Sequence, residues 1–289
     1  MQHLASTATL RATLKQWRGA DERIALVPTM GNIHEGHLRL IDAAREHAQR
    51  VVVSVFVNPT QFDRPDDFAR YPRTLDDDAA ALASRGADVL FAPQVETLYP
   101  DGLDLAAHVE PTHSAQGLEG EFRPGHFRGM ATIVVKLLSL VQPQLALFGE
   151  KDYQQLAVVR AVVRELLLPI DIVGVPIVRE ADGLAMSSRN SQLNASERAR
   201  APRLYEELNT AARLGATPDA PLADIEVRCT AKLSEVGFRV EYFCFRDAQL
   251  APPAPADARR VVLAAAWLGK TRLIDNHLFS VARGQGTPR

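Results

Sequence analysis

The sequence predicts an α/β protein with a mostly parallel sheet, followed by a smaller α+β domain. Strand-like and helix-like segments alternate through the N-terminal part of the chain, as parallel strands joined by right-handed crossovers require. Residues 51–57 form a continuous run of mostly β-branched residues, which is typical of a strand buried on both faces. A chain of 289 residues is long enough for two domains.

The N-terminal segment is the first predicted helix. Leu10, Leu14 and Trp17 recur at the spacing of one helix face. The same segment is basic and has no acid, which is also typical of a transit peptide, but the apolar spacing favours a packed helix.

The next elements follow in alternating order. An apolar run at 24–27 leads into a helix that carries Leu38, Ile41, Ala44 and Ala48, and then come strands at 51–57, 88–91, 145–148 and 170–178 and helices at 75–85, 131–141 and 152–168. In such sheets ligands bind beyond the carboxyl ends of the strands. The polar motifs of this chain directly follow strands, so we expect them at that edge.

The composition shifts after Asn194, which indicates a second domain. We place the boundary at 180, so that the domains span 1–180 and 181–289. The second contains alanine-rich helical stretches and strand-like runs at 238–245 and 261–268. Gly269-Lys270-Thr271 resembles the end of a P-loop, but Ala264 stands where its first glycine belongs, so we reject that interpretation.

Charge and cysteine content narrow the class of protein. The 33 basic and 35 acidic residues nearly balance, which argues against a broad nucleic-acid or membrane surface. No apolar run reaches transmembrane length. The two cysteines form neither a metal motif nor a disulfide framework. We therefore expect a cytoplasmic protein with small-molecule partners, and no nucleic-acid or membrane partner.

The most informative motif is Val-Pro-Thr-Met-Gly-Asn-Ile-His-Glu-Gly-His at 27–37. It places His34 and His37 where a strand passes into a helix, and the start of a helix offers main-chain N–H groups and positive charge to an anion. Gly31 and Gly36 allow close approach of a ligand to the main chain. A nucleotide phosphate fits this pattern, although the histidines could instead be solvated surface residues. The spacing is not that of a zinc protease.

A second motif, Asn58-Pro59-Thr60-Gln61-Phe62, follows the strand at 51–57. Amide side chains donate and accept hydrogen bonds, which suits a carboxylate substrate with hydroxyl groups. The alternative is an ordinary turn, because Asn-Pro often begins one.

Two further polar segments lie on either side of the helix at 131–141. Residues 119–129 form a cap or wall over the site, or else an ordinary exposed loop. In the segment 148–155, Lys151 could hold a phosphate oxygen and Gln155 could face the same cleft, while Asp152 could simply cap the helix.

The segment 178–190 contains the turn signal Asp182-Gly183 and then Met-Ser-Ser-Arg-Asn. Two hydroxyl groups and an arginine in succession suit a triphosphate in a movable loop. The alternative is a domain linker with a helix cap.

Taken in order, these motifs resemble the pantoate–β-alanine ligase family. The matching segments are Val-Pro-Thr-Met-Gly-Asn-Ile-His-Glu-Gly-His, Phe-Val-Asn-Pro-x-Gln-Phe, Tyr-Pro-Arg-Thr, Arg-Pro-Gly-His-Phe, Gly-Glu-Lys-Asp-Tyr-Gln-Gln and Met-Ser-Ser-Arg-Asn. One motif alone would indicate only the wider HxGH nucleotidyl-transfer superfamily.

The resemblance implies a Rossmann-like N-terminal domain, a C-terminal domain that covers the site, and a homodimer. It also implies an AMP-forming ligase with ATP as substrate and Mg²⁺ as cofactor. Pantoate would attack the α-phosphorus of ATP to give pantoyl adenylate and pyrophosphate. The amine of β-alanine would then attack that anhydride, giving pantothenate and AMP.

The resemblance also assigns residues. The catalytic set is His34, His37, Lys151, Ser187, Ser188 and Arg189. The ATP-binding set is Met30, Gly31, Asn32, Ile33, His34, Glu35, Gly36, His37, Gly149, Glu150, Lys151, Asp152, Val178, Met186, Ser187, Ser188 and Arg189. Pantoate and β-alanine would bind Asn58, Gln61 and Gln155, and Mg²⁺ would bind Asp77 and Asp78.

Two rival functions remain. Another HxGH-type adenylyltransferase should carry extra basic residues for an acceptor phosphate, whereas this chain offers amides there. A nucleotide- or RNA-binding module without catalysis is disfavoured by the near-neutral charge. Release of AMP that depends on both pantoate and β-alanine would separate all three.

Overall fold

The computed structural model describes residues 1–282. The chain forms two compact units: the first comprises 1–150 and 154–178, and the second comprises 151–153 and the chain from Arg179 onward. Residues 151–153 thus group with the second unit, although they lie inside the first predicted domain. Each unit is described by itself below.

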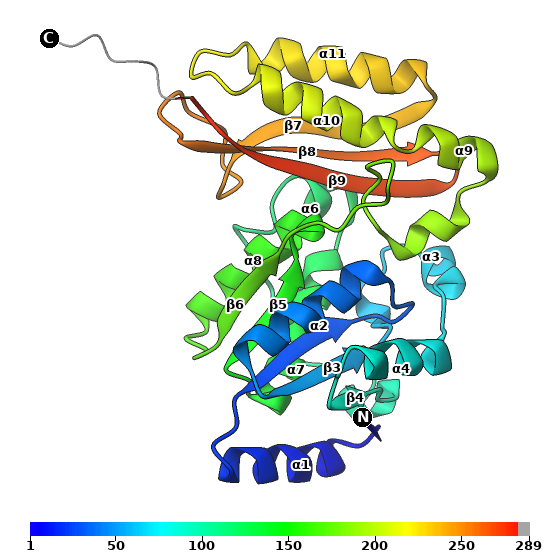
Figure 1. Ribbon diagram of the computed structural model, residues 1–289, viewed down its shortest axis with the longest axis vertical. Helices are drawn as coiled ribbons and strands as arrows, with labels where there is room; N and C mark the ends of the chain where they lie inside the picture. Colours follow the sequence, from blue (N-terminus) through cyan, green and yellow to red (C-terminus); the bar gives the residue numbers. More distant parts are fainter. Residues whose placement is uncertain (283–289) are drawn as a thin grey trace, which may run out of the picture. The chain divides into compact units, whose positions relative to one another are not determined.

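The first unit is built on a parallel sheet of six strands in the order β1-β4-β3-β2-β5-β6 (Figure 1). Its strands are β1 (Gln2–Leu4), β2 (Ile24–Thr29), β3 (Arg50–Val55), β4 (Val89–Phe91), β5 (Leu145–Gly149) and β6 (Asp171–Val175). Every neighbouring pair is parallel. The predicted α/β class with a Rossmann-like sheet is confirmed.

Helices cover both faces of this sheet. The helices from the N-terminus to α8 are α1 (Thr7–Gly19), α2 (Glu35–His47), α3 (Pro65–Arg70), α4 (Leu75–Ser84), α5 (Val95–Leu98), α6 (Glu119–Phe122), α7 (His126–Val141) and α8 (Tyr153–Glu165). The 3₁₀ turn η1 (Pro59–Gln61) belongs to the first unit, and η2 (Glu150–Asp152) lies where the chain passes into residues 151–153 of the second. Helices α1, α7 and α8 contribute to one core cluster, while α2 and α4 contribute to another. Successive residues of β3 alternate between the two clusters, as the pleat requires.

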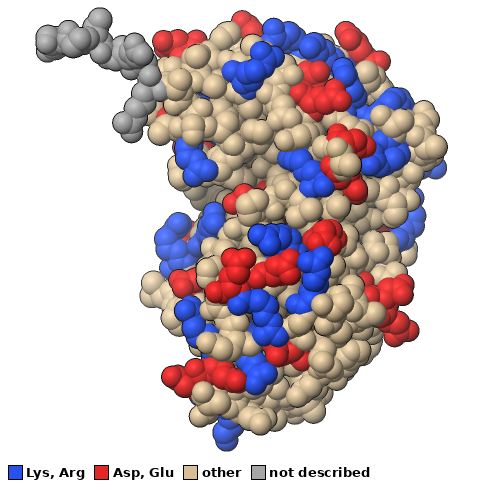
Figure 2. Space-filling model, viewed as in Figure 1, with Lys and Arg blue, Asp and Glu red and all other residues tan. Residues whose placement is uncertain are grey.

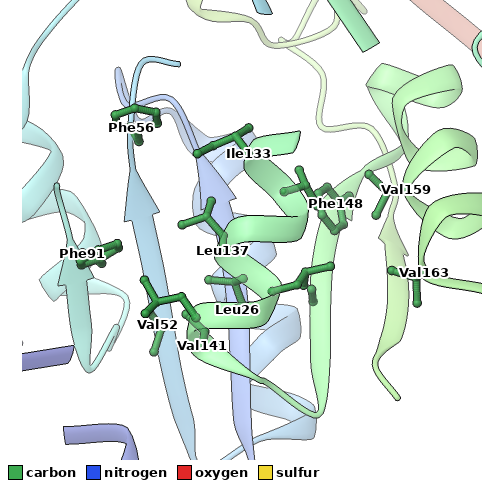
Figure 3. Close-up of a cluster of buried hydrophobic side chains, with 14 of the residues drawn as sticks. Leu26, Val52, Phe56, Phe91, Ile133, Leu137, Val141, Phe148, Val159 and Val163 are labelled. Atoms are coloured by element: carbon green, nitrogen blue, oxygen red, sulfur yellow. The ribbon is translucent and has the colours of Figure 1, made fainter. Parts of the chain in front are cut away.

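Helix α7 carries much of the first core. Ile133, Leu137 and Val141 point from it toward Leu26 and Val52 of the two central strands (Figure 3). Burial of such side chains contributes about 1.5–3 kcal/mol each relative to exposure. Because α7 is fixed so firmly to the sheet, the residues at its first turn have defined positions.

Several boundaries differ from the sequence predictions. Helix α7 begins at His126 rather than at 131, because Gly125 adopts a left-handed conformation (φ +80°) that starts the helix without a conventional capping side chain. Strand β6 ends at Val175, before Pro176, which has no N–H group for a sheet ladder. In α2 the buried stripe includes Leu40, while Leu38 is half-buried. Strand β1 was not predicted.

The second unit contains an antiparallel sheet of β7 (Phe238–Asp247), β8 (Arg259–Leu268) and β9 (Thr271–Ser280). Its helices are α9 (Ala195–Arg200), α10 (Arg203–Leu214) and α11 (Leu222–Glu235), preceded by the 3₁₀ turn η3 (Ser188–Gln192). Helices α10 and α11 pack on this sheet around a separate core. Gly269 and Lys270 form the turn between β8 and β9, so the rejection of a P-loop there is confirmed. The predicted smaller α+β domain is likewise confirmed.

The distribution of charged side chains on the surface agrees with the nearly equal numbers of basic and acidic residues in the sequence. On the face drawn in Figure 2, basic and acidic side chains are interspersed on both units. Within residues 1–282, no helix combines the length and hydropathy of a membrane span.

Candidate active site

The segment from Thr29 to His37, here called the glycine–histidine turn, joins β2 to α2. Gly31 (φ +83°) and Asn32 (φ +50°) both adopt left-handed conformations. A Cβ on residue 31 would lie 2.8 Å from Asp78 Oδ2 and 3.0 Å from Val55 Cγ1. Backbone conformation and space therefore both require glycine at this position.

Asp78 of α4 holds this turn from the side. Its carboxylate accepts hydrogen bonds from the main-chain N–H groups of Asn32 (3.0 Å) and Ile33 (2.8 Å). The hydroxyl group of Thr74 donates a third, 3.1 Å long. Asp78 is only 3% exposed, and hydrogen bonds from N–H groups to a buried carboxylate are strong. Asp78 therefore acts as an external clamp on the turn.

His34 and His37 lie at the start of α2. His34 precedes the helix in an extended conformation, and the two imidazole rings stack with centroids 4.0 Å apart. The main-chain N–H of His34 donates to His37 Nδ1 over 3.4 Å. Since Nδ1 is the acceptor there, the neutral ring of His37 carries its proton on Nε2. That N–H and the main-chain donors of the first helical turn are suited to a polyanion.

Asn58 and Gln61, here called the amide pair, lie at the two ends of the turn η1 after β3: Asn58 precedes the turn, Gln61 is its last residue, and both are buried. Asn58 Nδ2 donates to Gln61 Oε1 and to the main-chain carbonyl of Gly129, each over 3.1 Å. Asn58 Oδ1 accepts from the hydroxyl groups of Tyr99 (2.9 Å) and Thr60 (3.1 Å). Burial raises the pKa of Tyr99, so its hydroxyl group stays protonated and able to donate. With these bonds Asn58 fixes the orientation of Gln61.

Gln61 is thereby left with one defined donor group. Its Oε1 accepts from Asn58, so Nε2 points the other way and lies 3.0 Å from Met30 Sδ. A thioether is a weak acceptor, and an amide nitrogen has two hydrogens. Gln61 can therefore offer an N–H to a carboxylate or hydroxyl oxygen beside the glycine–histidine turn.

Gln154 and Gln155 open α8 but differ in surroundings. Gln155, the predicted pantoate ligand, is half-buried. Gln154 is buried, and its side chain binds the main chain of the segment 114–119 through four hydrogen bonds of 2.9–3.3 Å. That segment includes Glu119, which is also buried, so part of the predicted polar loop is tightly held.

The second unit holds Lys151 and the segment 186–189. Lys151 is half-buried, its Nζ lies 3.9 Å from Asp152 Oδ2, and its carbonyl accepts from Asn276 Nδ2 over 3.0 Å. Ser187 Oγ accepts from the N–H of Arg189 over 3.2 Å and so caps η3, as the linker interpretation expected. Met186, Ser188 and Arg189 are half-buried.

The other residues predicted to bind ATP or Mg²⁺ differ in their exposure to solvent. Glu35 is exposed and pairs with Arg85, and Gly149 and Glu150 follow one another at the end of β5. Ile33, Gly36 and Val178 are half-buried. Asp77 is exposed, beside the buried Asp78. Within residues 1–282, no group of three or more His, Cys, Asp or Glu side chains is arranged to hold a metal ion.

Sequence reasoning missed the contacts that two residues of this site make. Tyr99 and Asp78 act through contacts with residues 39 or more positions away, and no local motif marks such partners. The family resemblance does name Asp78, but as a ligand of Mg²⁺ and not as a support for the turn.

Comparison with known proteins gives the family. The model of the pantoate-beta-alanine ligase family matches residues 2–278. The chain belongs to this family. It is a ligase that condenses pantoate with β-alanine.

Its similarity to individual members extends over nearly the whole chain. A pantothenate synthetase of Methylococcus capsulatus is 49% identical over 97% of this chain and 99% of its own. The crystal structure of a pantothenate synthetase from Thermus thermophilus is 44% identical with a TM-score of 0.89, covering 96% of this chain and 99% of that one. A pantoate-beta-alanine ligase from Francisella tularensis, complexed with beta-gamma ATP and beta-alanine, is 35% identical with a TM-score of 0.81, covering 96% and 97%.

Proposed function

We propose that this ligase joins (R)-pantoate to β-alanine through a pantoyl adenylate, with ATP as the second substrate and AMP and pyrophosphate as by-products. The observation that carries the proposal is the position of the amide pair: Gln61 Nε2 lies beside Met30 of the glycine–histidine turn. A donor for a small hydroxy acid thus adjoins a set of donors suited to phosphates. The Francisella tularensis relative, which is complexed with beta-gamma ATP and beta-alanine, supports the choice of nucleotide.

The first step is displacement at phosphorus, which needs alignment and positive charge more than covalent help. Gln61 would orient pantoate so that a carboxylate oxygen faces the α-phosphorus. His34 and His37, with the first turn of α2, would stabilise the negative charge that grows on the leaving pyrophosphate. Lys151, Ser187, Ser188 and Arg189 offer further donors to phosphate oxygens.

In the second step the amine of β-alanine attacks the acyl carbon of the adenylate, and AMP leaves with the oxygen it received from pantoate. Gln155 and the amide pair would hold the pantoyl group during this step. The adenylate is prone to hydrolysis, so a site that excludes water would protect it. The proposed cover is the C-terminal domain.

Mg²⁺ is proposed to accompany ATP. It commonly binds phosphate oxygens, water and only one or two carboxylates, so a full protein cage is not required. Asp78 already accepts three hydrogen bonds, which leaves the exposed Asp77 as the better placed member of the pair. When bound, Mg²⁺ would neutralise charge on the triphosphate.

We also propose that the protein is a homodimer and that it is cytoplasmic. The free cysteines agree with a reducing compartment.

An isotope experiment tests the reaction path. The protein is incubated with ATP, Mg²⁺, β-alanine and pantoate whose carboxylate carries ¹⁸O, and AMP is analysed by mass spectrometry. The adenylate path predicts one ¹⁸O atom in each AMP and no AMP when either acid is omitted. Unlabelled AMP, or AMP formed without pantoate, would contradict it. An adenylyltransferase of another kind would form no AMP under these conditions.

A further inference from the structure

We propose that His126 is a positioning residue for pantoate: it fixes the main chain of Gln61, and so the direction in which the Gln61 side chain points. This inference rests on the role proposed above for Gln61. His126 is the first residue of α7 and is 6% exposed.

The hydrogen bonds of His126 define its protonation. Its Nδ1 lies 2.8 Å from the main-chain carbonyl oxygen of Gln61, and its Nε2 lies 3.2 Å from Arg123 Nη1. A guanidinium group has only donors, so Nε2 must accept. The ring is therefore neutral, with its proton on Nδ1, and that N–H donates to Gln61.

Arg123 strengthens the same contact. Its Nη2 also approaches the Gln61 carbonyl oxygen, at 3.4 Å. Two carboxylates hold the guanidinium in place: Asp63 at 3.2 Å and Glu119 at 3.7 Å. The carbonyl of Gln61 thus faces two donors, both supplied by the segment around the start of α7.

The next turn of α7 packs on the same segment. A Cβ on residue 129 would collide with the carbonyl group of Thr60, so only glycine allows this approach. The carbonyl group of Gly129 in turn accepts from Asn58. The first turns of α7 therefore set the position of residues 58–61, and His126 is the α7 side chain that binds the main chain of Gln61.

Loss of the His126 N–H donor should weaken the binding of pantoate but not that of ATP. Without the Nδ1–H group a buried carbonyl loses its main partner, and the Gln61 main chain can shift. The glycine–histidine turn is held separately by Asp78. We therefore expect pantoate binding to weaken while ATP binding is nearly unchanged.

A matched pair of variants tests this. Asparagine and leucine have similar size, but only asparagine places an N–H donor near the position of Nδ1. His126→Leu should raise the KM for pantoate about tenfold, the effect of roughly one hydrogen bond. The KM for ATP should change less than about twofold, and His126→Asn should restore most of the loss.

Two outcomes would overturn the inference: equal pantoate KM values for the two variants, or a parallel rise of the pantoate and ATP KM values. A double variant adds a check, because His126→Leu should do little further harm once Gln61→Ala is present. Additive effects on pantoate KM would also overturn it.

Thermal melting identifies a variant that fails to fold. In that event Arg123→Met provides the same comparison, with a raised pantoate KM expected and an unchanged one contradicting the proposal.

Failure of the positioning role is distinguishable from failure of the proposed function. If Gln61→Ala leaves pantoate KM unchanged, the role of Gln61 is wrong, whatever His126 does.

Discussion

The glycine–histidine turn and the amide pair present polar groups in opposite ways. In the turn, the side chains proposed to contact phosphate, His34 and His37, are half-buried, whereas Asp78, which supports the turn, is buried. In the amide pair the acting side chain is itself buried: Gln61 is 7% exposed and Asn58 is 1% exposed.

The difference follows from the ligands proposed for them. A triphosphate is highly charged and arrives hydrated, so main-chain donors and half-exposed imidazoles suffice. A small hydroxy acid is better recognised by buried polar groups. When the wrong molecule binds, these groups are left without hydrogen-bond partners, and that cost favours the correct substrate. The two regions should therefore respond differently to substitution.

The largest effect should come from His37→Ala. Loss of a donor to the leaving pyrophosphate should lower kcat by about 10²–10³-fold. His47, exposed at the end of the same helix, supplies the control, since His47→Ala should behave like the unmodified protein. A normal kcat in the His37 variant would remove this residue from the mechanism.

Gln61→Ala should act mainly on pantoate. A hydrogen bond to a charged group contributes about 1.5–3 kcal/mol, so the KM for pantoate should rise about 10–100-fold with little change for ATP. Steady-state kinetics with each substrate varied in turn measures both values. The exposed Gln16 serves as the matched control position. An unchanged pantoate KM would count against the proposed site.

Asp78→Asn should weaken nucleotide binding about tenfold, because the amide group turns an N–H toward a main-chain N–H of the turn. The measurement is ATP affinity by calorimetry, with Mg²⁺ and with a chelator. Asp77→Asn is the control and should alter only the Mg²⁺-dependent part. If Asp78→Asn leaves metal-free binding intact, Asp78 does not support the turn.

The smallest effect should come from Thr60→Val, which keeps the shape of the side chain and removes its hydrogen bond to Asn58. Stability should fall by about 1 kcal/mol in urea unfolding, and the KM for pantoate should rise a few-fold. Stability and KM values equal to those of the unmodified protein would show that the Thr60 hydroxyl group does not help to orient Asn58.

Much of the fold could be predicted because periodicity and β-branched runs are local properties. Leu10, Leu14 and Trp17 are all buried on α1 as the spacing predicts. Strand β1 escaped because three residues carry too little pattern. The start of α7 escaped because a left-handed glycine, and no polar cap, precedes it.

The candidate residues could be proposed from motifs, but their partners could not. The resemblance assigns Asp77 and Asp78 to Mg²⁺, whereas the contacts of Asp78 with Asn32 and Ile33 join segments distant in sequence. Likewise, nothing near residues 119–129 in the sequence indicates that His126 binds the main chain of Gln61. Such contacts exist only once the fold brings α4 to the turn after β2 and α7 to the segment after β3.

A crystal structure with bound nucleotide and pantoate tests most directly whether the glycine–histidine turn binds phosphate and the amide pair binds pantoate. We predict phosphate oxygens within hydrogen-bonding distance of His34 and His37, and a pantoate oxygen on Gln61 Nε2. Phosphates bound far from both imidazoles, or pantoate bound away from Gln61, would contradict the account.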